Sequence, residues 1–343
     1  MARTSSTPKN SSKKTEIDVL GIGNAIMDVI APIGDDFLTT HEIAKGGMTL
    51  IDEKHAIKLH KALDKAHKSV EIAGGSAANT MVGIASLGVS SAYVGKVASD
   101  ALGKRFTKGL RDSGLTYDTA PTSSGPSTAR CIIAVTQDGE RSMSTFLGAT
   151  TQLTKRDIIK SQIASARIVY LEGYLFDSDA AKAAFVKAAE IAQAAGRKVA
   201  LTLSDSFCVN IHRESFKQLV KHHVDILFAN EAELLALYET EDFDKAIKAV
   251  AKDCETACVT RGEKGSVIVT DGKRHTIPAV PVKKLVDTTG AGDQYAAGVL
   301  AARAMGLDWA DCGHLGSLCA AEVISHYGAR PEIRIQDLIT KSA

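Results

Sequence analysis

Residues Asp287 to Asp293 read Asp-Thr-Thr-Gly-Ala-Gly-Asp, and the small-residue run Gln-Tyr-Ala-Ala-Gly-Val-Leu-Ala-Ala follows directly. This pattern predicts a glycine turn at the start of a helix, with Asp293 in the first helical turn. A helix N-terminus presents unpaired N–H groups and a partial positive charge, which suit a phosphate group. A carboxylate would repel that phosphate unless it accepts a proton from the hydroxyl that attacks phosphorus. The stretch therefore indicates a phosphoryl-transfer site; the simpler alternative is an acidic helix cap.

Short apolar runs alternate with alanine-rich stretches along most of the chain. The expected buried strands are residues 17–23, 166–171, 198–203, 224–229 and 256–260, and the clearest helices are 74–87, 100–113 and 180–195. Strands that alternate with helices predict an α/β fold, with a mainly parallel central sheet flanked by helices. Residues 265–270 and 274–277, joined around Asp271-Gly272, are expected to add a hairpin.

Two segments, 24–51 and 125–147, depart from this alternation because they hold β-branched stretches with no expected helix between them. Residues 127–135 and 140–146 flank a Gln-Asp-Gly turn and predict a hairpin. Strands that the central sheet does not need can form a small separate sheet. We expect these segments to form such a β-sheet lid over the active site.

The chain of 343 residues is 45% hydrophobic and 24% charged, which is ordinary for a globular protein with a sizeable core. Residues 1–16 are rich in Ser, Thr and Lys and lack apolar periodicity, so we expect a disordered tail. Residues 17–338 are expected to form a single domain. No apolar run is long enough to span a bilayer and the N-terminus has no hydrophobic signal core, so no membrane partner is expected.

The net charge and the spacing of the cysteines indicate which class of partner and which cellular compartment to expect. The formal net charge is +1, and this near-neutral balance argues against a nucleic-acid or membrane-surface partner. The six cysteines show neither a Cys-x-x-Cys pair nor the spacing of a disulfide framework. Reduced, mostly buried thiols and a cytoplasmic location are therefore expected.

Two glycine-rich segments near the N-terminus could hold a hydroxylated ligand. The first, Gly21-Ile-Gly-Asn-Ala-Ile-Met-Asp28, resembles a dinucleotide fingerprint only superficially, because Ile26 stands where that motif needs its third glycine. Asn24 and Asp28 could offer an amide and a carboxylate to sugar hydroxyls, or could simply cap a turn. The second, Gly74-Gly-Ser-Ala-Ala-Asn79, opens a helix, and its glycines could equally serve packing.

Two further motifs follow predicted strands, where open α/β sheets bind ligands. Asn230-Glu-Ala-Glu233 places an amide and a carboxylate on one face of a helix start, where they could hold hydrated Mg²⁺ directly or through water. An acidic helix N-terminus is the alternative. Thr260-Arg-Gly-Glu-Lys-Gly265 suits a turn beside a nucleotide, and a plain tight turn would explain it equally well.

Together, and in this order, GGSAAN, NEAE, VTRGEKG and DTTGAGD resemble the ribokinase-like (PfkB-type) family of carbohydrate and nucleoside kinases over residues 17–335. The resemblance implies a single ribokinase-like α/β domain with a β-sheet lid, ATP as phosphoryl donor with Mg²⁺, and Asp293 as general base. It places the anion hole at the N–H groups of Gly290, Ala291 and Gly292. It assigns Asn230 and Glu233 to Mg²⁺, through water, and Asp287 and Thr289 to a monovalent cation, with K⁺ as the candidate. The nucleotide side would include Thr260, Gly262, Gly265 and Ser317, although family members commonly have Asn or His where Ser317 stands.

Within this family the chain is most similar to adenosine kinases, over residues 23–28, 36–38, 45–50, 52–55, 203–207 and 224–228 with Asn230. The similarity implies a ribose site formed by Asn24, Asp28, Gly75, Ser76 and Asn79. It implies an apolar slot for a purine formed by Ile26, Leu50, Met143, Tyr174 and Phe207.

The expected hairpin supports a lid independently of the resemblance. In residues 140–146, period-2 alternation puts Arg141, Met143 and Thr145 on one face of a strand. A cation and a flexible apolar side chain on one face suit a lid that closes over a phosphate and a base. The alternative for Arg141 is an ordinary solvated strand residue.

The sequence thus predicts ATP-dependent phosphorylation of the 5′-hydroxyl of a purine nucleoside, with adenosine to AMP as the first choice, a step of purine salvage. The alternatives are a sugar kinase of the ribose or fructose type, a non-catalytic nucleoside-binding regulator and, more distantly, a dinucleotide oxidoreductase. The expected partners are a small nucleoside and ATP, and both a monomer and a homodimer remain open.

Overall fold

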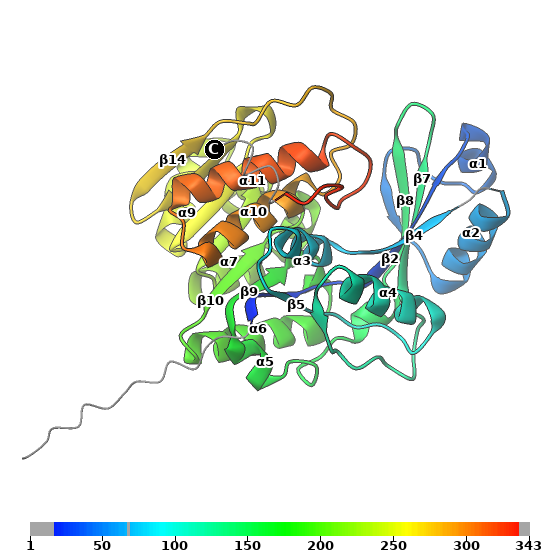
Figure 1. Ribbon diagram of the computed structural model, residues 1–343, viewed down its shortest axis with the longest axis horizontal. Helices are drawn as coiled ribbons and strands as arrows, with labels where there is room; N and C mark the ends of the chain where they lie inside the picture. The colour runs from blue at the N-terminus through cyan, green and yellow to red at the C-terminus, as the bar shows by residue number, and fades with distance from the viewer. Residues whose placement is uncertain (1–16, 67–68, 336–343) are drawn as a thin grey trace, which may run out of the picture.

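The alternating strands and helices fold into two β-sheets with helices packed against each, as the computed structural model of residues 17–66 and 69–335 shows (Figure 1). The expected tail at residues 1–16 and the expected domain end at residue 338 lie outside these described residues. The sheets differ in size and lie side by side, so that the smaller one stands beside one edge of the larger one.

The larger sheet contains nine strands within the described residues. They are β1 Ile17–Ile22, β5 Ser91–Val94, β6 Thr116–Tyr117, β9 Ala166–Glu172, β10 Lys198–Thr202, β11 Ile226–Asn230, β12 Thr256–Thr260, β13 Ser266–Thr270 and β14 Lys273–Ile277. Their order is β14-β13-β12-β11-β10-β9-β1-β5-β6, parallel from β12 to β6 and antiparallel at the β12–β13–β14 edge. The predicted parallel sheet and the hairpin around Asp271-Gly272 are confirmed.

Helices cover both faces of this sheet. One layer holds α3 Ser76–Ser86, α4 Ala101–Asp112, α10 Ala291–Met305 and α11 Trp309–Val323. The other holds α5 Lys160–Ser165, α6 Asp179–Ala194, α7 Ser206–His223, α8 Glu231–Tyr238 and α9 Phe243–Asp253. Successive strand residues feed opposite cores, as Val19 and Leu20 do, because side chains alternate across a strand. The three predicted helices are confirmed by their bounds, as α3, α4 and α6.

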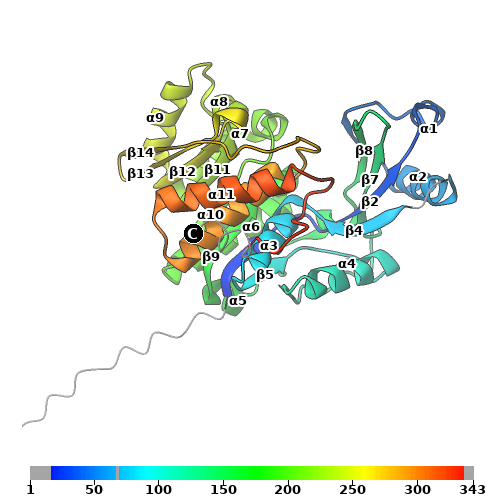
Figure 2. The same cartoon turned by 45° about the horizontal axis from the view of Figure 1, so that its top comes forward.

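The smaller sheet has the strand order β3-β8-β7-β2-β4. Its strands are β2 Ile26–Pro32, β3 Met48–Leu50, β4 Val70–Gly74, β7 Ala129–Val135 and β8 Arg141–Phe146. Helices α1 Asp35–Thr40 and α2 Glu53–Ala66 cover its outer face (Figure 2). The predicted hairpin is confirmed as β7 and β8, which pair antiparallel.

Two features of the smaller sheet differ from the sequence expectation. Residues 24–51 contain helix α1, where no helix was expected, because Phe37 and Leu38 bury their side chains against the outer face of the sheet. Strand β4 also joins the sheet, although it lies outside both expected segments. Strand β4 joins the sheet by pairing with β2. Its own sequence carries no hairpin signal that would reveal this distant partner.

The parallel strands point their carboxyl ends toward a single edge of the larger sheet. Strand β1 pairs with β5 on one side and β9 on the other, so the chain connectivity reverses there, as it does at the ligand sites of open α/β sheets. The short 3₁₀ helices η1 Gly148–Gln152, η2 Gly173–Asp177 and η3 Gly262–Lys264 lie in loops of the chain. All six cysteines are buried. No helix in the described part of the chain has the length and apolar character needed to span a membrane.

Candidate active site

Helix α10 begins at the glycine turn of residues 287–293. Gly290 is the N-cap, with a φ of 79°, and a Cβ there would lie 2.6 Å from Ala329 Cα, so both the turn and its packing require glycine. The Ala291 N–H donates to Thr288 O over 3.2 Å. Of the three N–H groups expected in an anion hole, that of Ala291 is therefore already engaged within the turn, whereas Ala291 and Gly292 both line the neighbouring cavity.

Asp293 meets helix α3 through a short hydrogen bond. Gly75 is the N-cap of α3, and Ser76, the first residue of that helix, donates from Oγ to Asp293 Oδ1 over 2.6 Å. The side chain of Asn79, one turn further along α3, also hydrogen-bonds to this carboxylate. The two helix starts therefore bring together the expected base and three residues of the expected ribose site.

Burial is the main influence on the charge of Asp293. It raises the pKa of this carboxyl group to about 6, while the hydrogen bonds from Ser76 and Asn79 act in the opposite direction by stabilising the ionised form. A carboxyl group with this pKa is ionised at neutral pH and can accept a proton, and it holds that proton more readily than an exposed aspartate would. These properties suit a general base.

Asp28 lies on the inner face of the smaller sheet, in strand β2. A Cβ at Gly74 would lie 2.2 Å from Asp28 Oδ2, so the carboxylate packs directly over the end of β4. The pKa of Asp28 is raised to about 7, mainly by burial and also by nearby Asp293, although the charges of Arg330 and Arg141 lower it. Asp28 and Asp293 are therefore near enough for each to act on the charge of the other.

Asn24 is buried and its side chain is committed to the protein. Its Nδ2 donates to Glu172 Oε1 over 2.8 Å, and its Oδ1 accepts from Thr150 Oγ1 over 2.8 Å. Glu172 Oε2 also accepts from the Ala77 N–H over 2.8 Å, at the start of α3. Asn24 therefore joins the carboxyl ends of β1 and β9, and this network supports the site without presenting a free amide to a ligand.

The inner face of the smaller sheet carries the expected base-binding residues of β2, β3 and β8. Asp28 pairs with Cys131, Cys131 with Thr145, and Thr145 with Leu50, forming one row across the sheet. Met143 lies in the next row along β8, and Ile26 begins β2. Paired residues share a face of the sheet, so Ile26, Leu50 and Met143 lie on the face that also carries Asp28.

Arg141 connects this sheet to the turn before α10. Its Nη1 lies 2.9 Å from Thr289 Oγ1 and 3.2 Å from Asp287 Oδ2, and both charged side chains are at most one-tenth exposed. Asp287 also accepts hydrogen bonds from the N–H groups of Thr289 and Gly328, over 3.0 Å and 2.9 Å. The Arg141 guanidinium thus contacts the two side chains that the family resemblance assigns to a monovalent cation.

Two members of the expected apolar slot lie in segments that follow strands β9 and β10 of the larger sheet. Tyr174 lies in η2, with its hydroxyl 3.4 Å from Ser204 O and a pKa that burial raises. Phe207, at the start of α7, is 73% exposed. Phe207 therefore lies against solvent, and a base could use its ring only if a ligand or a movement of α7 covered it.

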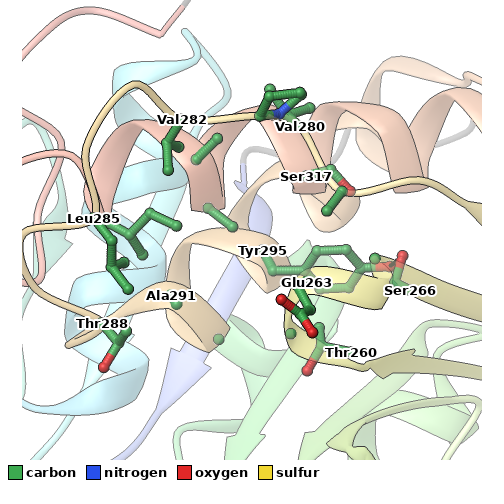
Figure 3. Close-up of a pocket in the computed structure, with 18 residues that line it drawn as sticks. Thr260, Glu263, Ser266, Val280, Val282, Leu285, Thr288, Ala291, Tyr295 and Ser317 are labelled. Carbon is green, nitrogen blue, oxygen red and sulfur yellow. Dashed lines mark hydrogen bonds between the residues drawn. The ribbon is translucent and has the colours of Figure 1, made fainter.

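A cavity of about 650 Å³ lies on the other side of the α10 N-terminus (Figure 3). It brings together the expected nucleotide-side residues Thr260, Gly262, Gly265, Ala291, Gly292 and Ser317. The loop before the glycine turn adds an apolar wall of Val280, Val282 and Leu285, opposite Thr260 and Glu263. An apolar cavity that opens onto a helix N-terminus is large enough for a nucleotide and suits a base joined to phosphates.

Asn230 and Glu233 form a complete capping box at the start of α8. Asn230 Oδ1 accepts from the Glu233 N–H over 2.8 Å, and the two Glu233 oxygens accept from the Asn230 N–H and Nδ2 over 3.0 Å and 2.6 Å. Burial raises the pKa of Glu233 to about 7. These oxygen atoms are hard donors of the kind Mg²⁺ prefers, but their engagement in the cap fits contact through water better than direct ligation.

Three parts of the site carried no clear sequence signal. Glu172, Arg330 and the wall at residues 280–285 gain their places only through contacts with distant segments. A buried glutamate at the end of an apolar strand is a weak signal that could have indicated Glu172. Nothing near Arg330 in the sequence separates it from an ordinary surface arginine.

Comparison with known proteins agrees with this geometry. The model of the pfkB family carbohydrate kinases matches residues 42–335. A solved adenosine kinase from Sinorhizobium meliloti is 47% identical, covers 96% of this chain and 100% of its own, and superposes with a TM-score of 0.87. A probable sugar kinase from Rhizobium etli CFN 42 is 43% identical, with 96% and 99% coverage and a TM-score of 0.87. Adenosine kinase 2 of Arabidopsis thaliana is 25% identical over 331 residues, which cover 90% of this chain and 94% of that protein.

The family match covers most of the chain, and the two solved structures share its ribokinase-like fold along nearly its whole length. Members of this family are kinases that transfer a phosphoryl group from ATP to a hydroxyl group of the acceptor, and the site described above has a buried carboxylate, a helix N-terminus and a nucleotide-sized cavity in one place. The chain therefore belongs to the pfkB family of carbohydrate kinases and is a phosphotransferase with a hydroxyl acceptor.

Proposed function

We propose that this enzyme transfers the γ-phosphoryl group of ATP to the 5′-hydroxyl of a purine nucleoside, with adenosine as the preferred acceptor and AMP as the product. The observation that carries the proposal is the position of Asp293. Its carboxylate lies at the start of α10, hydrogen-bonded to Ser76 and Asn79, with the acceptor face of Asp28 on one side and the 650 Å³ cavity on the other.

The chemistry follows from this placement. The acceptor hydroxyl gives its proton to Asp293 as its oxygen bonds to phosphorus, and the bond between the γ-phosphorus and the β–γ bridging oxygen breaks, releasing ADP. The α10 N-terminus at Gly290 and Gly292 stabilises the charge that develops on the transferred group. Asn230 and Glu233 would hold the water shell of Mg²⁺, which would supply further positive charge at the phosphates of ATP.

The inner face of the smaller sheet supports a base-bearing acceptor. Asp28 and Asn79 offer a carboxylate and an amide to ribose hydroxyls, while Ile26, Leu50 and Met143 offer apolar area to a purine. Leu50 is 56% exposed, so a bound base would cover apolar surface that now faces solvent. We propose that the smaller sheet acts as a lid that excludes water during transfer. The similar adenosine kinase from Sinorhizobium meliloti supports the same acceptor.

K⁺ is the candidate for a monovalent cation at Asp287 and Thr289. Arg141 holds both side chains in the structure, so the cation and the guanidinium would compete for them. The proposed partners are otherwise small molecules, a nucleoside and ATP, and the enzyme would act as a monomer or a homodimer.

The second candidate is a sugar kinase that phosphorylates ribose or fructose. The probable sugar kinase from Rhizobium etli is nearly as similar to this chain as the adenosine kinase is, with 43% against 47% identity. A non-catalytic nucleoside-binding regulator is a weaker alternative, because such a protein needs no buried base at Asp293.

A coupled assay of ADP release across adenosine, inosine, guanosine, ribose and fructose tests these alternatives. We expect the highest kcat/KM for adenosine. A higher value for a free sugar would replace the proposal with the sugar-kinase alternative. Nucleoside binding in calorimetry without ADP release from any acceptor would favour the regulator.

A further inference from the structure

The loop that follows α11 returns across the molecule to the acceptor side of the site. Figure 2 shows this segment, in red, passing beside α3 toward β4. At its turn, Arg330 donates from Nε to Asn79 Oδ1 over 3.1 Å and from Nη2 to Ala73 O. One guanidinium therefore contacts both the helix that carries Asn79 and the strand over which Asp28 packs.

The same catalytic elements fix the position of this loop. The Gly328 N–H donates to Asp287 Oδ2 over 2.9 Å, and Gln294 Nε2 donates to Ala329 O over 3.0 Å. Ala329 also packs against Gly290, the N-cap of α10. Arg330 thus follows two residues that are anchored to the phosphate-side turn, so its place beside Asn79 is part of the built site.

The hydrogen bond from Arg330 determines which way the Asn79 amide faces. A guanidinium has donors and no acceptor, so it can bond only to the amide oxygen. With Oδ1 turned to Arg330, the amide NH₂ is the group left to bond to the Asp293 carboxylate and to an acceptor hydroxyl. Without Arg330, the amide could turn over and present its oxygen to Asp293, which would repel it.

Arg330 also acts on Asp28 by its charge. It is the strongest opposite charge on that carboxyl group and opposes the burial that raises its pKa, and the pKa that results is about 7. The other charged or titratable groups that face Asp28 come from β8, α10 and β7; they are Arg141, Asp293 and the Cys131 thiol, whose pKa burial raises to about 12. Of these, only the two arginines favour the ionised form of Asp28.

We propose that Arg330 is a positioning residue for acceptor recognition, which orients the Asn79 amide and favours the form of Asp28 that accepts hydrogen bonds. This inference rests on the proposed function, since it assigns Asp28 and Asn79 to the hydroxyls of the acceptor. It makes acceptor affinity depend on pH through a residue that lies outside the motifs of the family resemblance.

The test compares full-length Arg330→Met and Arg330→Lys with wild type, and Arg334→Met serves as the matched control because Arg334 is an exposed arginine on the same segment. Calorimetry measures the Kd of the acceptor that wild type phosphorylates best, from pH 5.5 to pH 9, and kinetics give the KM of ATP and kcat. Thermal unfolding reports whether each variant is folded.

We expect Arg330→Met to weaken acceptor binding at pH 7 by about fivefold or more, because loss of a nearby opposite charge raises the pKa of Asp28 above 7 and leaves less of its ionised form. The weakening should shrink toward pH 9, where Asp28 ionises again. Arg330→Lys should restore the pH dependence and leave a smaller, pH-independent loss, because the ammonium lacks the fork of donors with which the guanidinium bonds to both Asn79 Oδ1 and Ala73 O. The KM of ATP should stay near that of wild type.

A loss that is equal at all pH values, or that affects ATP as much as the acceptor, would show a merely structural role and overturn the inference. Unchanged acceptor binding in a folded Arg330→Met variant would overturn it as well. If wild type binds a sugar and no nucleoside, the proposed acceptor is wrong, but the same pH series on that sugar still tests Arg330, because sugar hydroxyls need the same acceptor and amide.

Discussion

Ser76 Oγ donates a hydrogen bond to Asp293 Oδ1 over 2.6 Å, although 217 positions separate these residues in the sequence. The bond joins the first turns of α3 and α10, and it stabilises the ionised carboxylate against a burial that favours the neutral acid. In the proposed function, the acceptor and the transferred phosphoryl group therefore meet at Asp293, whose protonation should govern the reaction.

Replacement of Asp293 by Asn should abolish phosphoryl transfer and leave nucleoside binding largely intact. An amide keeps the shape of the side chain but cannot take the proton, so we expect kcat to fall by about 10²–10⁴-fold or more. Asp311→Asn is the matched control, since Asp311 is an exposed carboxylate in the first turn of the neighbouring helix α11. A variant at Asp293 with near-normal kcat would exclude the residue as the base.

The dependence of kcat on pH should reveal the ionisation of Asp293. The base works when deprotonated and its pKa is raised to about 6, so activity should fall as pH drops through 6 and reach a plateau above it. Ser76→Ala removes a hydrogen bond that favours the ionised form, and this acid limb should then move to higher pH. Ser86→Ala is the control, because the Ser86 hydroxyl donates to Gly83 O within α3, away from Asp293. An acid limb that stays in place in Ser76→Ala would contradict the assignment.

Replacement of Glu233 by Gln should raise the Mg²⁺ concentration required for activity more than it changes nucleoside affinity. The Gln side chain keeps the length of Glu233 but replaces one oxygen of the capping box with a donor, which faces Asn230 donors. Some loss of thermal stability is therefore expected too, of about 0.5–2 kcal/mol for a weakened cap.

The measurement for Glu233 is a Mg²⁺ titration at saturating nucleoside, with Glu241→Gln as an exposed control in the loop after α8. If the Mg²⁺ requirement stays that of wild type while the nucleoside KM rises, Asn230 and Glu233 belong to the fold of α8 and not to the metal.

Variants of the smaller sheet should separate recognition of the base from recognition of the ribose. Asp28→Ala removes the charged acceptor for the hydroxyls, at a cost of roughly 1.5–3 kcal/mol in binding any ribose-bearing acceptor. Met143→Asp places a charge where the base would pack and should penalise adenosine far more than free ribose. Met305→Asp, at the far end of α10 and 46% exposed, is the control. Equal losses for both acceptors in Met143→Asp would remove the apolar slot from the proposal.

Removal of the Arg141 guanidinium should expose a dependence on K⁺. Asp287 is only 7% exposed and pairs with Arg141 at 3.2 Å, so Arg141→Met leaves a buried carboxylate that needs another positive charge. We expect the variant to be stimulated by K⁺ much more strongly than wild type, in assays with tetramethylammonium as the replacement ion. Arg156→Met, at an exposed arginine, is the control. The same response to K⁺ in all three proteins would separate Arg141 from the cation site.

The sequence by itself determined those features that depend on neighbours along the chain. The glycine turn, the helix start and Asp293 are close in sequence, so their spacing alone predicts a helix N-terminus with a carboxylate in its first turn. The same holds for alternation of strands and helices, which specifies a parallel sheet because parallel strands need crossover helices, and for the β7–β8 hairpin, whose turn lies between its strands.

Only the tertiary structure decided the features that depend on contacts between distant segments. Arg330 bonds to Asn79, 251 positions away in the sequence, and Arg141 bonds to Thr289, 148 positions away. The residues next to each arginine in the sequence do not indicate which distant side chain it contacts. The sequence pattern of Asn230 and Glu233 indicated a metal site. Only the structure shows that these two side chains also bond to each other and form the capping box at the start of α8. Local sequence fixes backbone conformation through short-range sterics and hydrogen bonds, whereas the charge, orientation and exposure of a side chain depend on which distant segments pack around it.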